Sequence, residues 1–263
     1  RTDGATGGSG VDGMTASRAA ELAESLAALR GRLEAAAQAA GRAVGEIELL
    51  PVTKFFPASD VIELRRLGCT EFGESREQEA SNKVAEVAVH FASEVPSPLI
   101  RWHMVGRIQR KKARAIAGWA DTVHAVDGTA LAAALDRAAT AALDDGRRAE
   151  PMKVYVQVSL DGDPSRGGAD IGAPGLVDEV CAAVACADGL EFVGLMGVPP
   201  LSSNPAEAFA RLAAERERVQ ADYQHRLGLS AGMSNDLEAA VEHGSTCVRV
   251  GTALLGQRPL TSP

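Results

Sequence analysis

Two hydrophobic periods alternate along this chain of 263 residues. Leucines at helical spacing in an Ala-rich segment predict a long amphipathic helix over residues 17–40. After this helix, short apolar runs of strand length alternate with segments of helical period. The predicted strands cover residues 47–53, 71–73, 100–105, 122–126, 153–160, 191–196, 228–231 and 245–250.

Each strand but the last is followed by a predicted helix. Asn204 is expected to cap the one that starts at Pro205 and carries Tyr223. A basic helix is expected over residues 110–119, and a short extra helix over residues 253–256. Eight strand–helix units in about 250 residues predict an α/β fold, a single (β/α)8 TIM barrel with an extra N-terminal helix, rather than an open doubly wound sheet.

The first 13 residues are rich in Gly, Ser, Thr and Asp, and such a segment buries too little apolar surface to fold. We therefore expect residues 1–13 to be a disordered leader or tag remnant. Residues 14–263 are expected to form one domain.

Composition narrows the classes of function. The apolar fraction is 46%, the net charge is −8 and the pI is about 5.2. This acidic balance argues against nucleic-acid and anionic-membrane partners. No apolar run reaches the roughly 18 residues of a membrane span, so the protein is expected to be soluble and cytoplasmic. The four cysteines lack CxxC spacing, which predicts buried thiols, no disulfide and no metal site.

Candidate chemistry gathers where the first, seventh and eighth predicted strands end. In such barrels ligands bind at the carboxyl ends of the strands, and the last two loops often hold phosphate. Both turns contain small residues that let backbone amides approach an anion, and one of them stands at or near a helix start. They contribute Gly232, Met233 and Ser234 after strand seven, and Arg249, Gly251 and Thr252 after strand eight.

Lys54 ends the first strand, which neighbours the eighth in a closed barrel. Burial at a barrel mouth lowers the pKa of a lysine from about 10.4, and a neutral lysine can attack an aldehyde. A ligand held by Lys54 and by both turns carries an aldehyde and a phosphate, which indicates pyridoxal 5′-phosphate. Arg249 would then face the ring nitrogen and leave it unprotonated. The plain alternatives are a solvated lysine and ordinary helix caps.

At these positions the sequence resembles the pyridoxal phosphate homeostasis protein family (YggS/PROSC type), which is related to the N-terminal barrel of alanine racemases. The resemblance spans Leu22 to Gly256. Its motifs are Pro51-Val52-Thr53-Lys54, Phe72-Gly73-Glu74-Ser75, Trp102-His103-Met104-Val105-Gly106, Gly194-Leu195-Met196, Leu229-Ser230-Ala231-Gly232-Met233-Ser234 and Arg249-Val250-Gly251-Thr252.

The resemblance implies a fold-type III barrel that holds pyridoxal 5′-phosphate as a Schiff base on Lys54. Ser75 and Ser159 stand where the family usually has Asn, which puts a side-chain contact of Ser75 with the cofactor in doubt. The cofactor-binding residues are expected to be Lys54, Ser75, Gly232, Met233, Ser234, Arg249, Gly251 and Thr252.

Alanine racemases add a C-terminal domain with a tyrosine that acts as second acid/base, whereas this chain ends at Pro263. Its two tyrosines, Tyr155 in a strand and Tyr223 on a helix, are expected to pack in the core. We therefore expect no catalytic residue, and a monomeric carrier that acts in intracellular pyridoxal phosphate homeostasis, with apoenzymes that use this cofactor as recipients. The alternatives are a racemase-like enzyme of low activity with His103 as base, and an aldolase-type Schiff-base barrel without cofactor.

Overall fold

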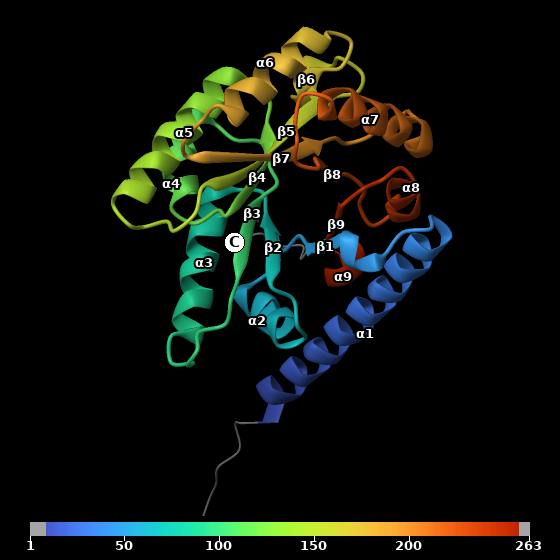
Figure 1. Cartoon of the computed structure of the whole chain (residues 1–263). Helices are drawn as coiled ribbons and strands as arrows, with labels where there is room; N and C mark the ends of the chain where they lie inside the picture. Colours follow the sequence, from blue (N-terminus) through green and yellow to red (C-terminus); the bar gives the residue numbers. More distant parts are fainter. Residues whose placement is uncertain (1–8, 258–263) are drawn as a thin grey trace, which may run out of the picture.

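The computed structural model describes residues 9–257, and its parallel strands form a nearly closed barrel surrounded by helices (Figure 1). The wall follows the order β1-β9-β8-β7-β5-β4-β3-β2, and the two-residue β6 pairs with β5 outside this path. The strands are β1 (Glu48–Pro51), β2 (Glu71–Glu74), β3 (Arg101–Met104), β4 (Thr122–Val126), β5 (Met152–Ser159), β6 (Ala169–Asp170), β7 (Leu190–Met196), β8 (Gly228–Ser230) and β9 (Cys247–Val250).

Two seams of the barrel are sparsely paired. Between β1 and β2 the wall closes through one bridge, Val52 with Gly73, beside a hydrogen bond of 2.8 Å from the Thr53 amide to the Gly73 carbonyl. Between β8 and β9 the register holds a single pair, Ser230 with Cys247. The β1–β9 seam between them is longer, with four paired positions. The first and last strands of the chain therefore lie side by side.

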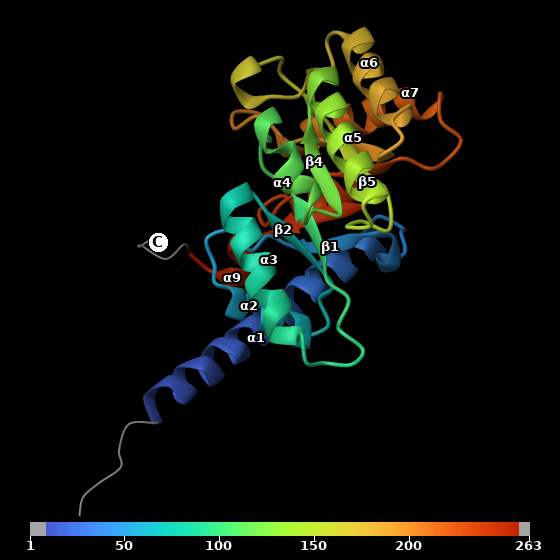
Figure 2. The same ribbon diagram turned by 90° about the vertical axis from the view of Figure 1, so that its left-hand side faces the viewer.

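The helices cover the outside of this wall, and α1 lies across α2, α8 and α9 (Figures 1 and 2). Buried aliphatic side chains of strands and helices form two core clusters. The leucines of α1 belong to one of them and are almost fully buried. The helices are α1 (Ser9–Ala39), α2 (Ala58–Arg66), α3 (Glu77–Phe91), α4 (Ala113–Ala117), α5 (Thr129–Asp144), α6 (Pro174–Ala185), α7 (Pro205–Gln220), α8 (Leu237–Glu242) and α9 (Thr252–Leu255).

The predicted barrel with its extra N-terminal helix is confirmed. Every strand predicted from periodicity is present, with each end within two residues of its predicted position. Asn204 caps α7 as expected, because its side chain accepts a hydrogen bond of 2.9 Å from the Ala206 amide. No helix among residues 9–257 has the length and apolar content needed to cross a membrane.

Several local predictions need correction. Helix α1 begins at Ser9, inside the segment expected to be a disordered leader, and residues 1–8 lie outside the described part. The basic helix over 110–119 is a 3-10 turn (Arg110–Lys112) followed by the short α4, which ends at Ala117. Tyr223 follows α7, which ends at Gln220, and Cys186 is exposed although the other three thiols are buried. Strand β6 was not predicted because two residues carry no periodicity.

Candidate functional site

A cavity of about 480 Å³ opens at the carboxyl ends of β1, β8 and β9. It brings together six of the eight predicted residues: Lys54, Met233, Ser234, Arg249, Gly251 and Thr252. Ser75 and Gly232 are not among its lining residues. The remaining lining residues are Val52, Phe55, Phe56, Val105, Met196, Val198, Asn235 and Gly256. Apolar walls with a few convergent polar groups are typical of a small-molecule site.

A tight turn places Lys54 at the edge of this cavity. The Phe56 amide donates a hydrogen bond of 3.1 Å to the Thr53 carbonyl, which closes the turn around Lys54. Phe55 has a φ of 68°, a left-handed conformation that is strained for a bulky residue. The Phe55 amide donates to Glu79 Oε1, and this bond holds the strained residue in place. The direction in which Lys54 leaves the strand is therefore set by its neighbours.

A buried ion pair supports the turn from below. Lys83 Nζ lies 2.5 Å from Glu74 Oε1 and donates a hydrogen bond of 2.7 Å to the Thr53 carbonyl. The Thr53 hydroxyl donates to the same carboxylate oxygen at 2.6 Å. Burial raises the pKa of Glu74, while the neighbouring Lys83 and Thr53 oppose that rise. This network joins β1, β2 and α3 directly behind Lys54.

Sequence reasoning missed this ion pair, although a signal existed. In α3 the buried residues Ala80, Lys83, Val87 and Phe91 share one face. A lysine on an apolar helix face needs a buried partner, and Glu74 at the end of a neighbouring strand was the available one.

The two turns at the far side of the cavity are tied to each other. Ser234 Oγ accepts a hydrogen bond of 3.2 Å from the Ala253 amide, so the turn after β8 contacts the start of α9. Asp236, two residues after Ser234, is the N-cap of α8, and its carboxylate accepts from the Met233 amide at 2.6 Å. Among the described residues we find no acceptor for the amides of Ser234, Gly251 and Thr252. These amides can bind an anion in the cavity.

Gly232 shapes the turn without lining the cavity. It is buried and has a φ of +91°, and a Cβ at this position would lie 2.5 Å from the Ala240 Cβ. Only glycine combines this backbone conformation with this close approach to α8. Ser75 is half-buried, and its carbonyl oxygen would lie 2.2 Å from a Cβ on Gly106. Ser159 lines two other cavities and its hydroxyl donates to Asp161.

Helix α1 fastens the turn after β8 from outside the barrel. Arg32 donates from Nη2 to the Ser234 carbonyl at 3.1 Å. The same guanidinium holds Glu238 of α8 through two hydrogen bonds of 2.9 and 3.0 Å. The extra N-terminal helix therefore buries a core cluster and also positions the turn that contains Ser234.

Arg249 brings a permanent positive charge to the cavity. Its side chain is 7% exposed, and Nη1 donates to Ser230 Oγ at 2.5 Å. A longer bond of 3.4 Å joins Nη2 to the Gly197 carbonyl. Burial lowers the pKa of Arg249, yet a guanidinium keeps its proton in a protein. The cavity thus contains a fixed hydrogen-bond donor that cannot accept.

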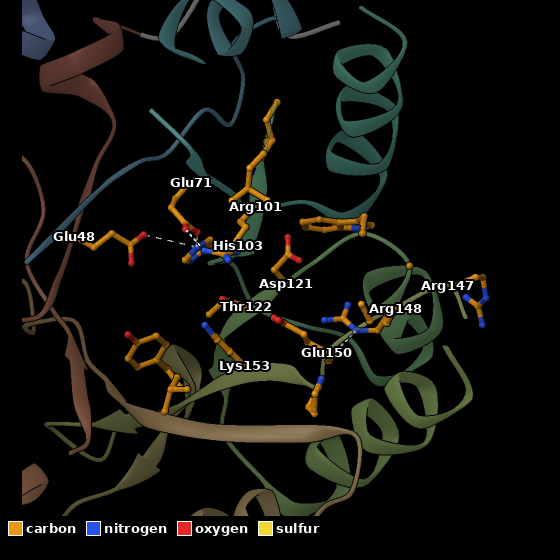
Figure 3. Close-up of a pocket in the computed structure, with 18 residues that line it drawn as sticks. Glu48, Glu71, Arg101, His103, Asp121, Thr122, Arg147, Arg148, Glu150 and Lys153 are labelled. Carbon is orange, nitrogen blue, oxygen red and sulfur yellow. Dashed lines mark hydrogen bonds and ion pairs between the residues drawn. The ribbon is translucent and has the colours of Figure 1, made fainter. Parts of the chain in front are cut away.

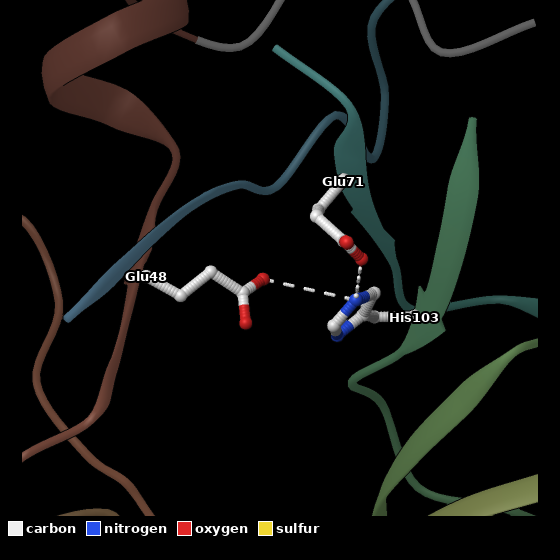
Figure 4. A group of neighbouring side chains, drawn as sticks. All are labelled: Glu48, Glu71 and His103. Carbon is white, nitrogen blue, oxygen red and sulfur yellow. Dashed lines mark hydrogen bonds and ion pairs between the residues drawn. The ribbon is translucent and has the colours of Figure 1, made fainter. Parts of the chain in front are cut away.

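A second cavity, of about 520 Å³, lies at the opposite end of the barrel, where the strands begin (Figure 3). Its wall includes His103 of β3, whose Nε2 lies 2.7 Å from Glu71 Oε2 and 3.7 Å from Glu48 Oε1 (Figure 4). Acidic and basic side chains alternate around it, Asp121, Lys153 and Arg148 among them. The two cavities share no lining residue.

Comparison with known proteins shows the family to which the chain belongs. Residues 25–259 match the family described as alanine racemase, N-terminal domain. The pyridoxal phosphate homeostasis protein of Mycobacterium tuberculosis is 63% identical over 248 residues, which cover 94% of this chain and 96% of that protein.

Solved structures share the fold. PipY of Synechococcus elongatus PCC7942 with PLP bound is 33% identical, with a TM-score of 0.72 over 89% of this chain and all of that one. Alanine racemase of Corynebacterium glutamicum is 17% identical, with a TM-score of 0.60 over 92% of this chain and 61% of that chain. The chain therefore belongs to the pyridoxal phosphate homeostasis protein family, whose barrel shares the fold of the N-terminal domain of alanine racemases.

Proposed function

We propose that this chain binds pyridoxal 5′-phosphate covalently through Lys54 and acts in its homeostasis without substantial catalysis. The observation that carries the proposal is the convergence of Lys54, three amides without acceptors and a buried arginine on one cavity of about 480 Å³. Relatives named for pyridoxal phosphate homeostasis and a family member with PLP bound support it.

The residues present fit this cofactor group by group. Pyridoxal 5′-phosphate carries an aldehyde for Lys54 and a phosphate for the amides of Ser234, Gly251 and Thr252. Arg249 is suited to the ring nitrogen, because it can only donate and the unprotonated nitrogen can accept. Gly232 lets the turn lie close against α8, and Met233 lines the cavity on the same side. Ser75 is retained as a cofactor neighbour in this proposal.

The bound cofactor supplies an aldehyde and an electron-withdrawing ring, which in enzymes is strongest when the ring nitrogen is protonated. An arginine opposite that nitrogen keeps it unprotonated, so Arg249 restrains chemistry on bound amino acids. Lys54 then serves to retain the aldehyde, and the strained turn around Phe55 keeps the amine directed into the cavity.

The absence of a second acid/base at the cavity supports a carrier. Among the described residues that line it there is no tyrosine and no histidine. Tyr155 lines the cavity at the opposite end, and Tyr223 packs edge-on against Phe192 at 4.9 Å between ring centroids. His103, the base of the racemase alternative, also lies at the opposite end. The proposal includes a monomeric, cytoplasmic protein that delivers the cofactor to apoenzymes.

Borohydride trapping tests the proposal. Purified protein incubated with pyridoxal 5′-phosphate should show visible absorption, and reduction should fix the cofactor on Lys54, identified by peptide mass. Lys54→Ala should abolish both signals, whereas Lys111→Ala, which removes an exposed lysine, should change neither. A cofactor trapped mainly on another lysine would contradict the assignment.

Catalysis is tested separately with alanine. Deuterium exchange at its α-carbon should be no faster with the protein than with free pyridoxal 5′-phosphate. Multiple-turnover exchange above that rate would restore the racemase-like alternative.

A further inference from the structure

A line of buried polar groups crosses the barrel interior from one mouth to the other. It begins at Glu71 in the wall of the cavity at the strand starts, where His103 donates to its carboxylate (Figure 4). His103 Nδ1 lies 2.9 Å from His124 Nε2, and His124 Nδ1 lies 2.8 Å from Ser230 Oγ. Ser230 Oγ accepts from Arg249, which lines the proposed cofactor cavity. Four strands, β2, β3, β4 and β8, supply the members before Arg249 of β9.

Donor and acceptor chemistry decides which partner donates the hydrogen in each bond of this line of polar groups. Arg249 only donates, so Ser230 Oγ accepts from it, and we assign the Ser230 hydrogen to His124 Nδ1, which lies 2.8 Å away. Burial is the largest cause that lowers the pKa of His124 well below its ordinary value, and the charge of Arg249 acts in the same direction, so this imidazole is neutral. A neutral imidazole that accepts at Nδ1 donates at Nε2, which assigns the hydrogen between the rings to His124.

The same reasoning extends to the distant mouth. His103 Nδ1 accepts from His124, so its hydrogen stands on Nε2 and is donated to Glu71 Oε2 at 2.7 Å. In this pattern every member between the ends donates once and accepts once. Reversal of one bond leaves two donors facing each other or a buried acceptor without a hydrogen, and either fault is costly inside a protein.

Packing holds the rings in this arrangement. The His124 ring stacks on Tyr155, with centroids 4.7 Å apart and planes 27° apart. His124 and Ser230 are fully buried, and His103 is 3% exposed. Apart from the long bond to the Gly197 carbonyl, Ser230 is the hydrogen-bond partner that the described residues offer to the Arg249 side chain.

We propose that Ser230 and His124 are positioning residues that hold the Arg249 guanidinium in the cofactor cavity, and that His103 makes this hold depend on Glu71 at the opposite mouth. The consequence for the cofactor rests on the proposed function, since Arg249 matters there as the partner of the ring nitrogen. The hold on Arg249 itself exists with or without cofactor.

Protein without cofactor provides the first test. Long-range ¹⁵N–¹H spectra should show both His103 and His124 with their hydrogen on Nε2. Glu71→Ala should alter the guanidinium signals of Arg249, whereas Glu71→Gln, which keeps an oxygen acceptor for His103, should leave them close to wild type. Hydrogen on Nδ1 of His124, or identical Arg249 signals in Glu71→Ala and wild type, would overturn the proposal.

The second test uses added pyridoxal 5′-phosphate. Ser230→Ala should shift the absorption band and weaken retention about tenfold, because a hydrogen bond to a charged group is lost. Glu71→Ala should shift the band in the same direction, and Glu71→Gln should restore it. The matched control Ser245→Ala removes another buried hydroxyl, which donates to the Ala231 carbonyl and is not part of the line from Glu71 to Arg249. This variant should leave the band unchanged.

The outcomes separate the two proposals. If wild-type protein takes up no pyridoxal 5′-phosphate, the proposed function fails. The spectra without cofactor still decide whether the line of polar groups positions Arg249. If wild-type protein binds the cofactor and all variants keep its absorption band, the line of polar groups has a structural role alone and the positioning proposal is wrong. Because Glu71 lies at a partly exposed mouth, Glu71→Ala keeps the test valid should Ser230→Ala fail to fold.

Discussion

Gly232→Ala should damage the turn after β8 in two separable ways. The backbone at this position has a φ of +91°, which costs a residue with a side chain about 1–2 kcal/mol. The new Cβ would also lie 2.5 Å from the Ala240 Cβ of α8, a contact that forces the turn or the helix to move. Such overpacking costs about 1–3 kcal/mol more, so the total loss should be about 2–5 kcal/mol.

A matched glycine isolates the first part. Gly41 has a φ of +65° and no atom within 4 Å of a Cβ built on it, so Gly41→Ala measures backbone strain without a clash. The free energy of unfolding from urea titration should therefore fall more in Gly232→Ala than in Gly41→Ala, by about 1–3 kcal/mol. Cofactor retention should fall in Gly232→Ala alone, since Ser234 lies two residues further along the same turn.

A double-mutant cycle with Ala240→Gly tests whether the clash is the cause. Ala240→Gly alone should cost about 1 kcal/mol because glycine weakens the helix. Combined with Gly232→Ala it should remove the contact, so the double variant should be more stable than the sum of the single losses by about 1–2 kcal/mol. Strict additivity, or equal losses for Gly232→Ala and Gly41→Ala, would refute the reasoning.

Other contacts lead to three further predictions. Lys83→Met leaves Glu74 buried without its cation, and the free energy of unfolding in urea should fall by about 3–5 kcal/mol. Because the pKa of His124 is lowered in the folded protein, only the unfolded chain takes up a proton there just below pH ~6.5. The free energy of unfolding should therefore decrease as the pH is lowered below about 6.5, by up to about 1.4 kcal/mol per pH unit. A His124→Asn variant should lose this dependence in melting experiments at different pH. Arg32→Ala should weaken retention of pyridoxal 5′-phosphate in dialysis, whereas Arg30→Ala, which removes another arginine of α1, should not.

The sequence was sufficient for the barrel because strand and helix periods are local. The Lys54 position and the two turns could also be predicted, since a parallel barrel brings the carboxyl ends of its first and last strands together. Their convergence on one cavity followed from topology alone, without any side-chain contact.

The supporting contacts could not be predicted in the same way. Arg32 and Ser234 are 202 positions apart, and Arg32 looks like any charged residue on an amphipathic helix. His124 and Ser230 lie in buried strands where a polar residue has no visible partner in sequence. Which polar groups meet inside a barrel depends on register across several strands, and no pattern in one strand contains that information.

The proposed cofactor site lies beside the two seams of the barrel that have the fewest register pairs. Lys54 follows β1, Ser234 follows β8 and Gly251 follows β9, while the β8–β9 and β1–β2 seams each hold one register pair. The hydrogen bond from the Ala253 amide to Ser234 Oγ joins the segments after β8 and β9, and the hydrogen bond from the Arg32 side chain to the Ser234 carbonyl joins the segment after β8 to α1. A ligand held by all three would add links across the same seams, so cofactor binding and closure of the barrel stabilise each other.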